Sequence, residues 1–303
     1  MTNIMLNKVN TVLMVGGLLF SSQAISITFS LPSQGDVIGK IQKTTVKRGE
    51  TLATIGRKFD VGVIEMIEAN PNLDPWVPTV GATLIVPTQF ILPPGPRTGI
   101  VINLAEMRLY YYHPDGRRVS THPIGVGRKN GWSTPIGNAR ILSKVKDPAW
   151  HPPASIRREH LAKGDVLPGV VPAGPNNPLG RYAFKLSMPG ILLHGSNRPG
   201  GVGVRSSHGC IRMLPEDIES LYHTVPIGTS VRVIHEPYKV GWHNNKLYLE
   251  AHQPLSEPKF HGSGSISNLQ KIIQRNLPGT YTVNWSTAKH TANAHSGCPT
   301  CID

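Results

Sequence analysis

The amino-acid sequence predicts a mainly β, sandwich-like domain with one or two helices, preceded by a small α+β unit of strand–helix–helix–strand order. Glycine and proline contribute 31 and 27 of the 303 residues, which favours many turns and few long helices. Between residues 98 and 237, short apolar runs of strand length alternate with turn residues such as Asp115-Gly116. Apolar residues at helical spacing occur in only a few short stretches.

The first 24 residues read as a signal peptide for export. Lys8 supplies the positive start, Val12 to Phe20 form a short apolar core, and Ser22-Gln23-Ala24 is a small-x-small cleavage site. The apolar run is too short for a membrane span, and no cysteine follows it that could carry a lipid anchor. We therefore expect cleavage near Ala24 and a periplasmic protein without an integral membrane segment. A buried N-terminal helix is the alternative.

The chain is basic, with a formal net charge of +13, and its 39% hydrophobic and 16% charged residues are typical of globular proteins. A positive surface favours polyanionic partners such as anionic lipid or a carboxylate-rich wall polymer. Export disfavours nucleic acid, and the sequence has no basic run interleaved with aromatic residues. A diffuse, solvated basic surface is the alternative to substrate steering.

Residues 25–43 read as a lead-in segment, and residues 44–88 form the small α+β unit. Thr44-Thr45-Val46 is strand-like, Asn70-Pro71-Asn72 ends the second helix, and Leu84-Ile85-Val86-Pro87 reads as a closing strand. Two sets of apolar residues recur at helical spacing, namely Leu52, Ile55 and Phe59, then Val63, Met66 and Ile67. This order resembles a LysM module, a family that binds the glycan of peptidoglycan or chitin. A spacer without a binding role is the alternative.

Residues 89–97 are Pro-rich and read as a stiff linker to the main β domain at 98–237. We expect its strands within six apolar runs, at residues 100–104, 107–112, 136–141, 182–186, 191–193 and 231–234. One helix is expected from Pro215, since proline fits a first turn and Glu216 and Asp217 complement the helix dipole.

Two further segments flank or interrupt this domain. Lys144 to Pro172 is rich in proline, charge and histidine, and an insertion of this length is either a lid over a binding site or an ordinary surface excursion. Residues 238–286 predict a hairpin with its turn at Asn244-Asn245, followed by a short amphipathic helix. Residues 287–303 predict a disordered tail.

Cys210 lies in the run Ser206-Ser207-His208-Gly209-Cys210-Ile211-Arg212-Met213, after the pair His194-Gly195. A thiol, an imidazole and a glycine-flanked turn are the minimum for acyl transfer through a thioester, because the reactive thiolate needs a base or a lowered pKa. Gly209 lets consecutive N–H groups converge on one oxygen. In an oxidising compartment Cys298 and Cys301 either pair or remain two free thiols.

These residues together resemble the signature of the peptidoglycan L,D-transpeptidases, whose catalytic domain is of the YkuD type. The resemblance begins near Gly99-Ile100, includes Pro135-Ile136-Gly137 and Val171 to Gly180, and runs to about Pro237. With the LysM-like module, the chain is most similar to the periplasmic subgroup that attaches lipoproteins.

The resemblance implies Cys210 as nucleophile and His194 as proton acceptor and donor, with the carbonyl of Gly195 orienting the ring. Backbone N–H groups of Cys210 and Gly209 would form the oxyanion hole. His208 is the rival for the base, and Arg212 could hold a substrate carboxylate or brace the loop. The candidates for substrate binding are Arg212, Ser207, His208 and Gly195, of which Ser207 is also expected to brace the loop.

The resemblance also implies the reaction. Cys210 attacks the carbonyl of the third residue of a tetrapeptide stem, releases D-Ala, and passes the thioester to an amine of another stem, giving a 3–3 cross-link, or to a lipoprotein lysine. Water as acceptor would make a hydrolase, either an L,D-carboxypeptidase or a lipoprotein-releasing enzyme, and a non-catalytic peptidoglycan-binding protein is a further alternative. No cofactor, metal or nucleic acid is expected; the partners are stem peptides, glycan and a wall-anchored lipoprotein.

Overall fold

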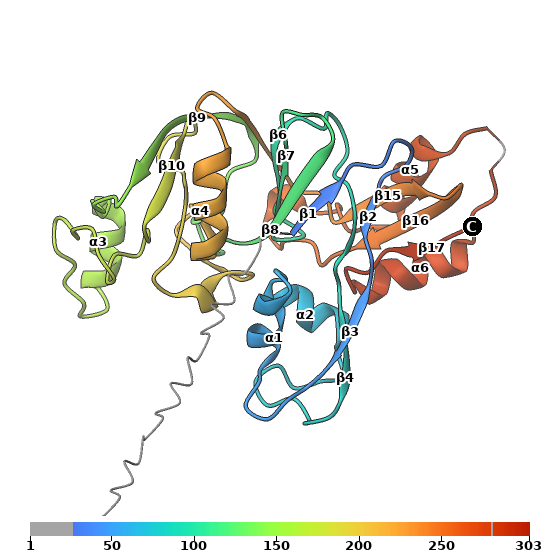
Figure 1. Cartoon of the computed structure of the whole chain (residues 1–303), viewed down its shortest axis with the longest axis horizontal. Coiled ribbons are helices and arrows are strands. Elements are labelled where there is room, and N and C mark those ends of the chain that lie inside the picture. Colours follow the sequence, from blue (N-terminus) through green and yellow to red (C-terminus); the bar gives the residue numbers. More distant parts are fainter. Residues whose placement is uncertain (1–26, 280) are drawn as a thin grey trace, which may run out of the picture.

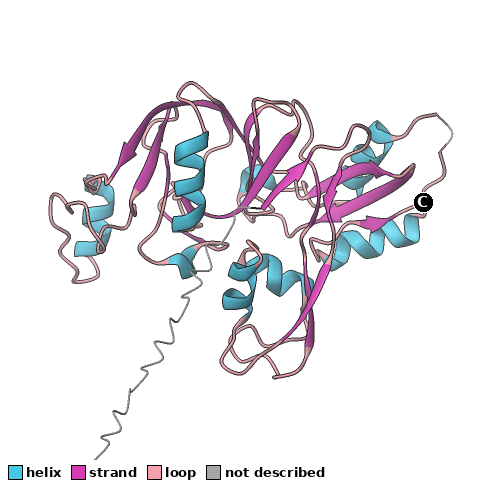
Figure 2. Cartoon of the chain, in the orientation of Figure 1, coloured by secondary structure: helices cyan, strands magenta, loops and turns pink. Residues whose placement is uncertain are grey.

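The computed structural model describes residues 27–279 and 281–303 (Figure 1). The predicted signal peptide at 1–24, with its cleavage site at Ala24, lies outside the described residues. Within the described ranges, every helix is too short or too polar to cross a membrane. Figure 2 shows strands through the centre of the molecule, with short helices around them.

The larger domain is built on one ten-stranded sheet, and its hydrogen-bonded strand order leads back to its own start. The order is β1-β8-β13-β11-β10-β9-β14-β6-β7, β12 pairs with β8, and β7 also pairs with β8. The ladders therefore join in one closed path, in which the long strands β8 and β9 each pair with neighbours on both sides. The strands are β1 (Ile27–Ser30), β6 (Gly99–Asn103), β7 (Arg108–Tyr112), β8 (Arg118–Gly127), β9 (Gly137–Lys146), β10 (Tyr182–Leu186), β11 (Leu192–His194), β12 (Arg205–Ser207), β13 (Ile211–Met213) and β14 (Ser230–Ile234).

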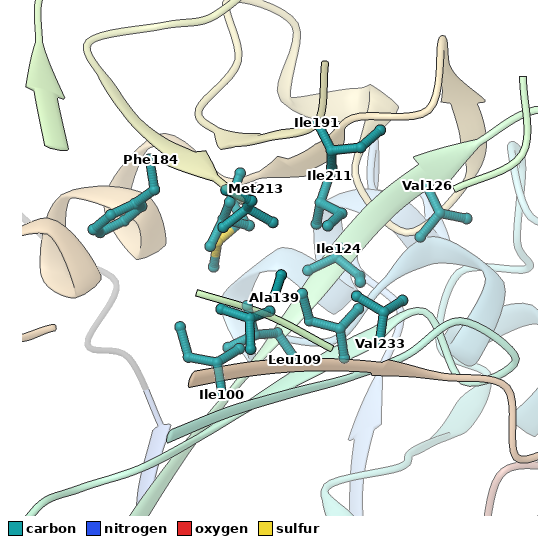
Figure 3. Close-up of a cluster of buried hydrophobic side chains, with 14 of the residues drawn as sticks. Ile100, Leu109, Ile124, Val126, Ala139, Phe184, Ile191, Ile211, Met213 and Val233 are labelled. Carbon is teal, nitrogen blue, oxygen red and sulfur yellow. The ribbon is translucent and has the colours of Figure 1, made fainter. Parts of the chain in front are cut away.

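Apolar side chains from these strands fill the space that the sheet encloses (Figure 3). Ile124, Phe184 and Ile211 are fully buried there. Helix α4 (Pro215–Thr224) packs against β10 and adds Ile218 and Leu221 to the same core. Burial of one such side chain contributes ~1.5–3 kcal/mol, so this core is what holds β11 and β13 in register.

The small module has the order β3 (Gln42–Thr45), α1 (Leu52–Lys58), α2 (Val63–Ala69) and β4 (Thr83–Val86), with β3 and β4 antiparallel. Thr51 caps α1 by accepting the N–H of Thr54. Leu52 and Met66 meet in a core of their own. In Figure 1 the two helices lie below the central sheet.

The segment predicted as a linker at 89–97 begins instead as β5 (Gln89–Ile91), which pairs with β2 (Val37–Gly39). Phe90 and Leu92 are buried against Val101 and Tyr112 of the main sheet. The prolines at Pro93 and Pro94 follow the strand and end it. The chain thus enters and leaves the small module as a two-stranded ladder.

The C-terminal unit contains β15 (Tyr238–His243), β16 (Lys246–Ala251) and β17 (Thr300–Cys301), covered by α5 (Ile266–Asn276) and α6 (Trp285–Ala294). Asn244 and Asn245 both have positive φ, as a two-residue hairpin turn requires. The prediction of a disordered tail at 287–303 is wrong. Small residues at helical spacing, Ala288 and Ala292, are fully buried, and so is Ile302 after β17.

Candidate active site

The site lies where two parallel strands, β11 and β13, are neighbours. Leu193 pairs with Ile211, and His194 pairs with Arg212. Leu193 and Ile211 are fully buried in the core. Because side chains alternate along a strand, His194, Arg212 and the residue just before β13, Cys210, belong to the opposite face. The register therefore brings thiol, imidazole and guanidinium to one side of the sheet.

The Cys210 thiol is half-buried and contacts the main chain of the strand beside it. The N–H of Leu192 points at Sγ at 3.4 Å, and Sγ lies 3.5 Å from the carbonyl oxygen of Gly190. Burial raises the pKa of Cys210, against smaller opposing effects of the Leu192 N–H and of the Arg212 charge. The sulfur is therefore a neutral thiol near pH 7, and its activation requires a base.

The His194 ring is buried, and two backbone carbonyls, those of Gly195 and Leu179, hydrogen-bond to it. Nδ1 lies 2.7 Å from the carbonyl oxygen of Gly195, the acceptor that the sequence analysis names. A carbonyl can only accept, so Nδ1 carries the proton of the neutral ring and Nε2 has the lone pair. Burial, helped by the charge of Arg212, lowers the pKa of His194 to about 4. The ring is a neutral base near pH 7.

The loop before Cys210 is braced by Ser207 and Thr134. Ser207 Oγ donates to the carbonyl of Cys210 at 2.5 Å and accepts the N–H of Gly209 at 3.2 Å, and Thr134 Oγ donates to the carbonyl of Gly209 at 2.9 Å. Gly209 has φ of +103°, which disfavours any side chain. Ser207 is buried and does brace the loop. The N–H of Gly209 is committed inside the loop, which leaves the N–H of Cys210 as the better oxyanion donor.

The other two candidates have partners of their own. Arg212 Nη1 donates to Ser206 Oγ at 3.1 Å. His208 Nε2 lies 3.0 Å from Glu159 Oε2, and its ring meets the Trp132 ring edge-on with centroids 4.6 Å apart. Nη2 of Arg128 lies 3.0 Å from the same Nε2, so this nitrogen is held between a guanidinium and a carboxylate.

Glu159 comes from the Lys144–Pro172 insertion, which forms the end of β9 and helix α3 (Ala154–Leu161). It also pairs with Arg128 and Lys163. A hollow of about 450 Å³ is lined by these three residues, Lys129, Asn130 and Trp132. Sequence reasoning missed Glu159, Arg128 and Trp132. The only signal was the unusual composition of the insertion, which says nothing about pairs far apart in the chain.

Cys298 and Cys301 are both free thiols in the C-terminal unit. Burial raises the pKa of Cys298 to about 11, so this thiol is protonated and unreactive near pH 7. Two buried groups have donor sets that could hold a metal: Asp60 with His122 and Asp217, and Glu106 with Glu250 and His252.

The sequence matches two known protein families. Residues 97–233 match the L,D-transpeptidase catalytic domain of the YkuD family, and residues 44–87 match the LysM domain. The probable L,D-transpeptidase YcfS of Escherichia coli K12 is 44% identical over 236 residues, which are 76% of this chain and 74% of that protein. The probable L,D-transpeptidase YbiS of the same strain is 39% identical over 288 residues, 92% of this chain and 93% of that protein.

Among solved structures, the NMR structure of the catalytic domain from E. faecium L,D-transpeptidase is 25% identical and covers 45% of this chain and 96% of that one. Its TM-score is 0.34, so the family assignment rests on the sequence relatives.

Proposed function

Since this chain belongs to the L,D-transpeptidase family and carries a LysM domain, we propose that it is a cysteine acyltransferase that acts on peptidoglycan stem peptides in the periplasm. Cys210 is the nucleophile and His194 is the base. The observation that carries the proposal is the placement of these two residues on one face of β11 and β13, with the ring held by the Gly195 carbonyl.

The first half-reaction begins from the neutral pair. Nε2 of His194 takes the thiol proton as Sγ attacks the carbonyl carbon of the third stem residue, which forms a tetrahedral oxyanion. The C–N bond to D-Ala then breaks, the imidazolium returns its proton to the leaving amine, and a thioester with Cys210 remains. Neither group needs to carry a charge before substrate arrives, in keeping with the raised pKa of the thiol and the lowered pKa of the imidazole.

The oxyanion is stabilised by the backbone N–H of Cys210. Loss of one such donor typically costs ~3 kcal/mol of transition-state stabilisation. Ser207 and Thr134 keep this N–H in place through their bonds to the carbonyls on either side of it. Substrate binding is served by the basic hollow beside His208, where Arg128, Lys129 and Lys163 suit a carboxylate-bearing stem.

In the second half-reaction an amine attacks the thioester, His194 takes its proton, and the thiolate leaves and is reprotonated. The acceptor is the side-chain amine of another stem or a lipoprotein lysine. Similarity to YcfS and YbiS over most of the chain fits either amine acceptor better than water. The LysM domain holds the glycan from which the stem projects.

Incubation of the protein with purified sacculi, followed by digestion and mass spectrometry of the muropeptides, tests this function. Loss of D-Ala with a new 3–3 bond or a lipoprotein adduct supports it. Loss of D-Ala alone would indicate a hydrolase, and unchanged muropeptides would leave only a wall-binding protein.

Intact-protein mass spectrometry with a carbapenem tests the residues. We expect a covalent adduct on the native chain and none on Cys210→Ala. His194→Ala should abolish thioester formation, whereas His208→Ala should leave a measurable rate. The reverse pattern for the two histidines would overturn the assignment of the base.

A further inference from the structure

Three buried titratable side chains outside the catalytic cleft meet where the LysM module contacts the catalytic domain. Asp60 follows α1 of the module, His122 is in β8, and Asp217 is in the first turn of α4. Nδ1 of His122 lies 3.2 Å from Asp217 Oδ1 and 3.6 Å from Asp60 Oδ2. One donor atom from each residue lies within 4.8 Å of the others. We call these three residues the interface trio.

The carboxylates of the trio are buried without matching hydrogen bonds. The side chains of Asp60 and Asp217 are 8% and 2% exposed. Apart from each other's carboxyl group, both carboxylate oxygens of Asp60 and Oδ2 of Asp217 have no side chain or main chain of the described residues in hydrogen-bonding geometry. Two adjacent carboxylates cannot satisfy each other, because both only accept when ionised. Their arrangement requires a proton or a cation between them.

The nearest positive side chains are matched by other acids. Arg108 donates to both carboxylate oxygens of Glu65, at 2.8 and 2.9 Å, and touches only the main-chain oxygen of Asp60. Arg57 pairs with Glu216 at 2.9 Å. Each of these pairs is neutral as a unit, so the two carboxylates of the trio leave a charge of −2, the charge that a divalent cation would cancel.

The structure also provides room and a route. A cavity of about 30 Å³ is lined by Asp60 and Asp217 together with Phe59 and Leu214, and the Arg57–Glu216 pair stands at its surface side. A cavity of that size has room for a water molecule.

We propose that Asp60, His122 and Asp217 bind one divalent metal ion of the zinc class, with water from the cavity as a fourth ligand. One imidazole nitrogen and two carboxylates at this spacing are a donor set that zinc accepts in proteins. The ion ties the loop after α1 to the helix that follows β13, and so fastens the LysM module to the catalytic domain. Because the ligands must be deprotonated, binding strengthens as pH rises.

Protons compete with a metal ion for these ligands. Burial and the charge of Asp217 raise the pKa of Asp60 well above its usual value, and burial raises the pKa of Asp217 to about 7. Burial lowers the pKa of His122 to about 4, which keeps the ring neutral as a ligand must be. The charged groups that face the trio or line its cavity are Arg108, Glu216, Arg57 and Lys58, and all of them are paired, Lys58 with Glu50. Without metal, protons take the place of the ion.

The test uses the whole exported chain purified without a histidine tag, stripped with EDTA and dialysed against Zn²⁺ at pH 8. Elemental analysis by plasma mass spectrometry should find one more zinc ion per chain in the native protein than in Asp217→Asn. Asp60→Asn is the second variant, since both substitutions remove a buried charge and should leave the fold intact by circular dichroism. Zn²⁺ should raise the melting temperature of the native chain and of neither variant.

Cobalt(II) separates this site from the thiols. Cobalt held by the trio should show d–d absorption without thiolate-to-metal charge transfer, whereas a charge-transfer band would place the ion on a cysteine. Asp165→Asn, at an exposed position, is the control variant and should bind as the native chain does. Equal zinc content in the native chain and in Asp217→Asn, or a cobalt spectrum with the thiolate band only, would overturn the proposal and leave a shared proton in the trio.

Discussion

Two buried clusters of acids with a histidine connect parts of this molecule, and they differ in the source of their positive charge. Around Lys239, the ammonium lies 2.9 Å from Glu106 and 2.8 Å from Glu250, and it also donates to the carbonyl of Ile91. His252 contacts Glu250 at 2.7 Å and Glu68 of the LysM module at 3.5 Å. In the interface trio, two carboxylates and His122 have no lysine among them.

The two histidines show what this difference does. Burial disfavours the charged form of both rings. In the Lys239 cluster, the hydrogen bond to Glu250 and the nearby Glu68 carboxylate overcome burial and raise the pKa of His252 to about 10. In the trio, burial dominates and the pKa of His122 falls to about 4. A cluster that contains its own cation can keep its acids ionised, whereas one without it must hold a proton or bind an ion.

Removing the internal cation should have the largest effect. Lys239→Met leaves Glu106 and Glu250 buried without their partner, and breaking a buried pair in this way costs ~3–5 kcal/mol. The free energy of unfolding from urea titration measures the loss. Lys246→Met, on the exposed end of β16, is the control and should change stability little. A loss as small as that of the control would mean that the Lys239 cluster contributes nothing net.

The contribution of the interface trio to the free energy of unfolding should depend on pH. The pKa of Asp217 is raised to about 7 in the folded chain from an ordinary 3.8, so the native state holds a proton that the unfolded state releases between these values. The metal-free native chain therefore loses stability as pH rises from 4 through 7, and Asp217→Asn loses less, because only Asp60 then keeps a raised pKa. Relative to the native chain, the free energy of unfolding of Asp217→Asn should increase across that pH window, by about 4 kcal/mol at most. A difference independent of pH would contradict this.

His194, the proposed base, has a third environment, in which backbone carbonyls are the hydrogen-bond partners and the Arg212 guanidinium is near. Carbapenem acylation should lose rate only as pH falls through about 4, where His194 gains its proton, instead of through the usual 6.5. Arg212→Met removes a charge that lowers this pKa, so the acid limb should move upward. Mass spectrometry of samples quenched at successive times gives the acylation rate at each pH. An acid limb that is unchanged in Arg212→Met would show that the guanidinium does not act on the ring.

The smallest effect is expected at Glu159, where water screens the ion pairs. Hydrogen bonds from Lys163 and Arg128 lower the pKa of Glu159 to about 2, so it is ionised at any working pH. Glu159→Gln should loosen His208 and slow acylation by less than about fivefold. Asp165→Asn, near the same helix, should leave the rate unchanged. A loss comparable with that of His194→Ala would place Glu159 in the catalytic machinery.

Part of this structure could be predicted from short sequence patterns. The rest depends on contacts between residues that are far apart in the chain. The proline start of α4 and the Asn244-Asn245 turn each depend on a few adjacent residues, so the sequence alone was enough to predict them, while the roles of Cys210 and His194 stay predictions. The tail was misread because α6 buries alanine and threonine, which have little apolar signal, against β16.

Residues such as Glu159 and Asp60 could not have been chosen from the sequence. The first meets His208 across 49 positions, and the second meets Asp217 from another domain. Isolated acids in a chain are mostly solvated, and only the fold shows which ones lose their water.

The paired strands β2–β5 and β3–β4 have a mechanical consequence. A single connecting strand would let the LysM module swing, but two antiparallel strands joined by hydrogen bonds resist bending and twisting together. Together with the Arg108–Glu65 and Arg57–Glu216 pairs, these ladders fasten the LysM module to the main domain at several points, so unfolding of the module alone would also break contacts with its neighbour.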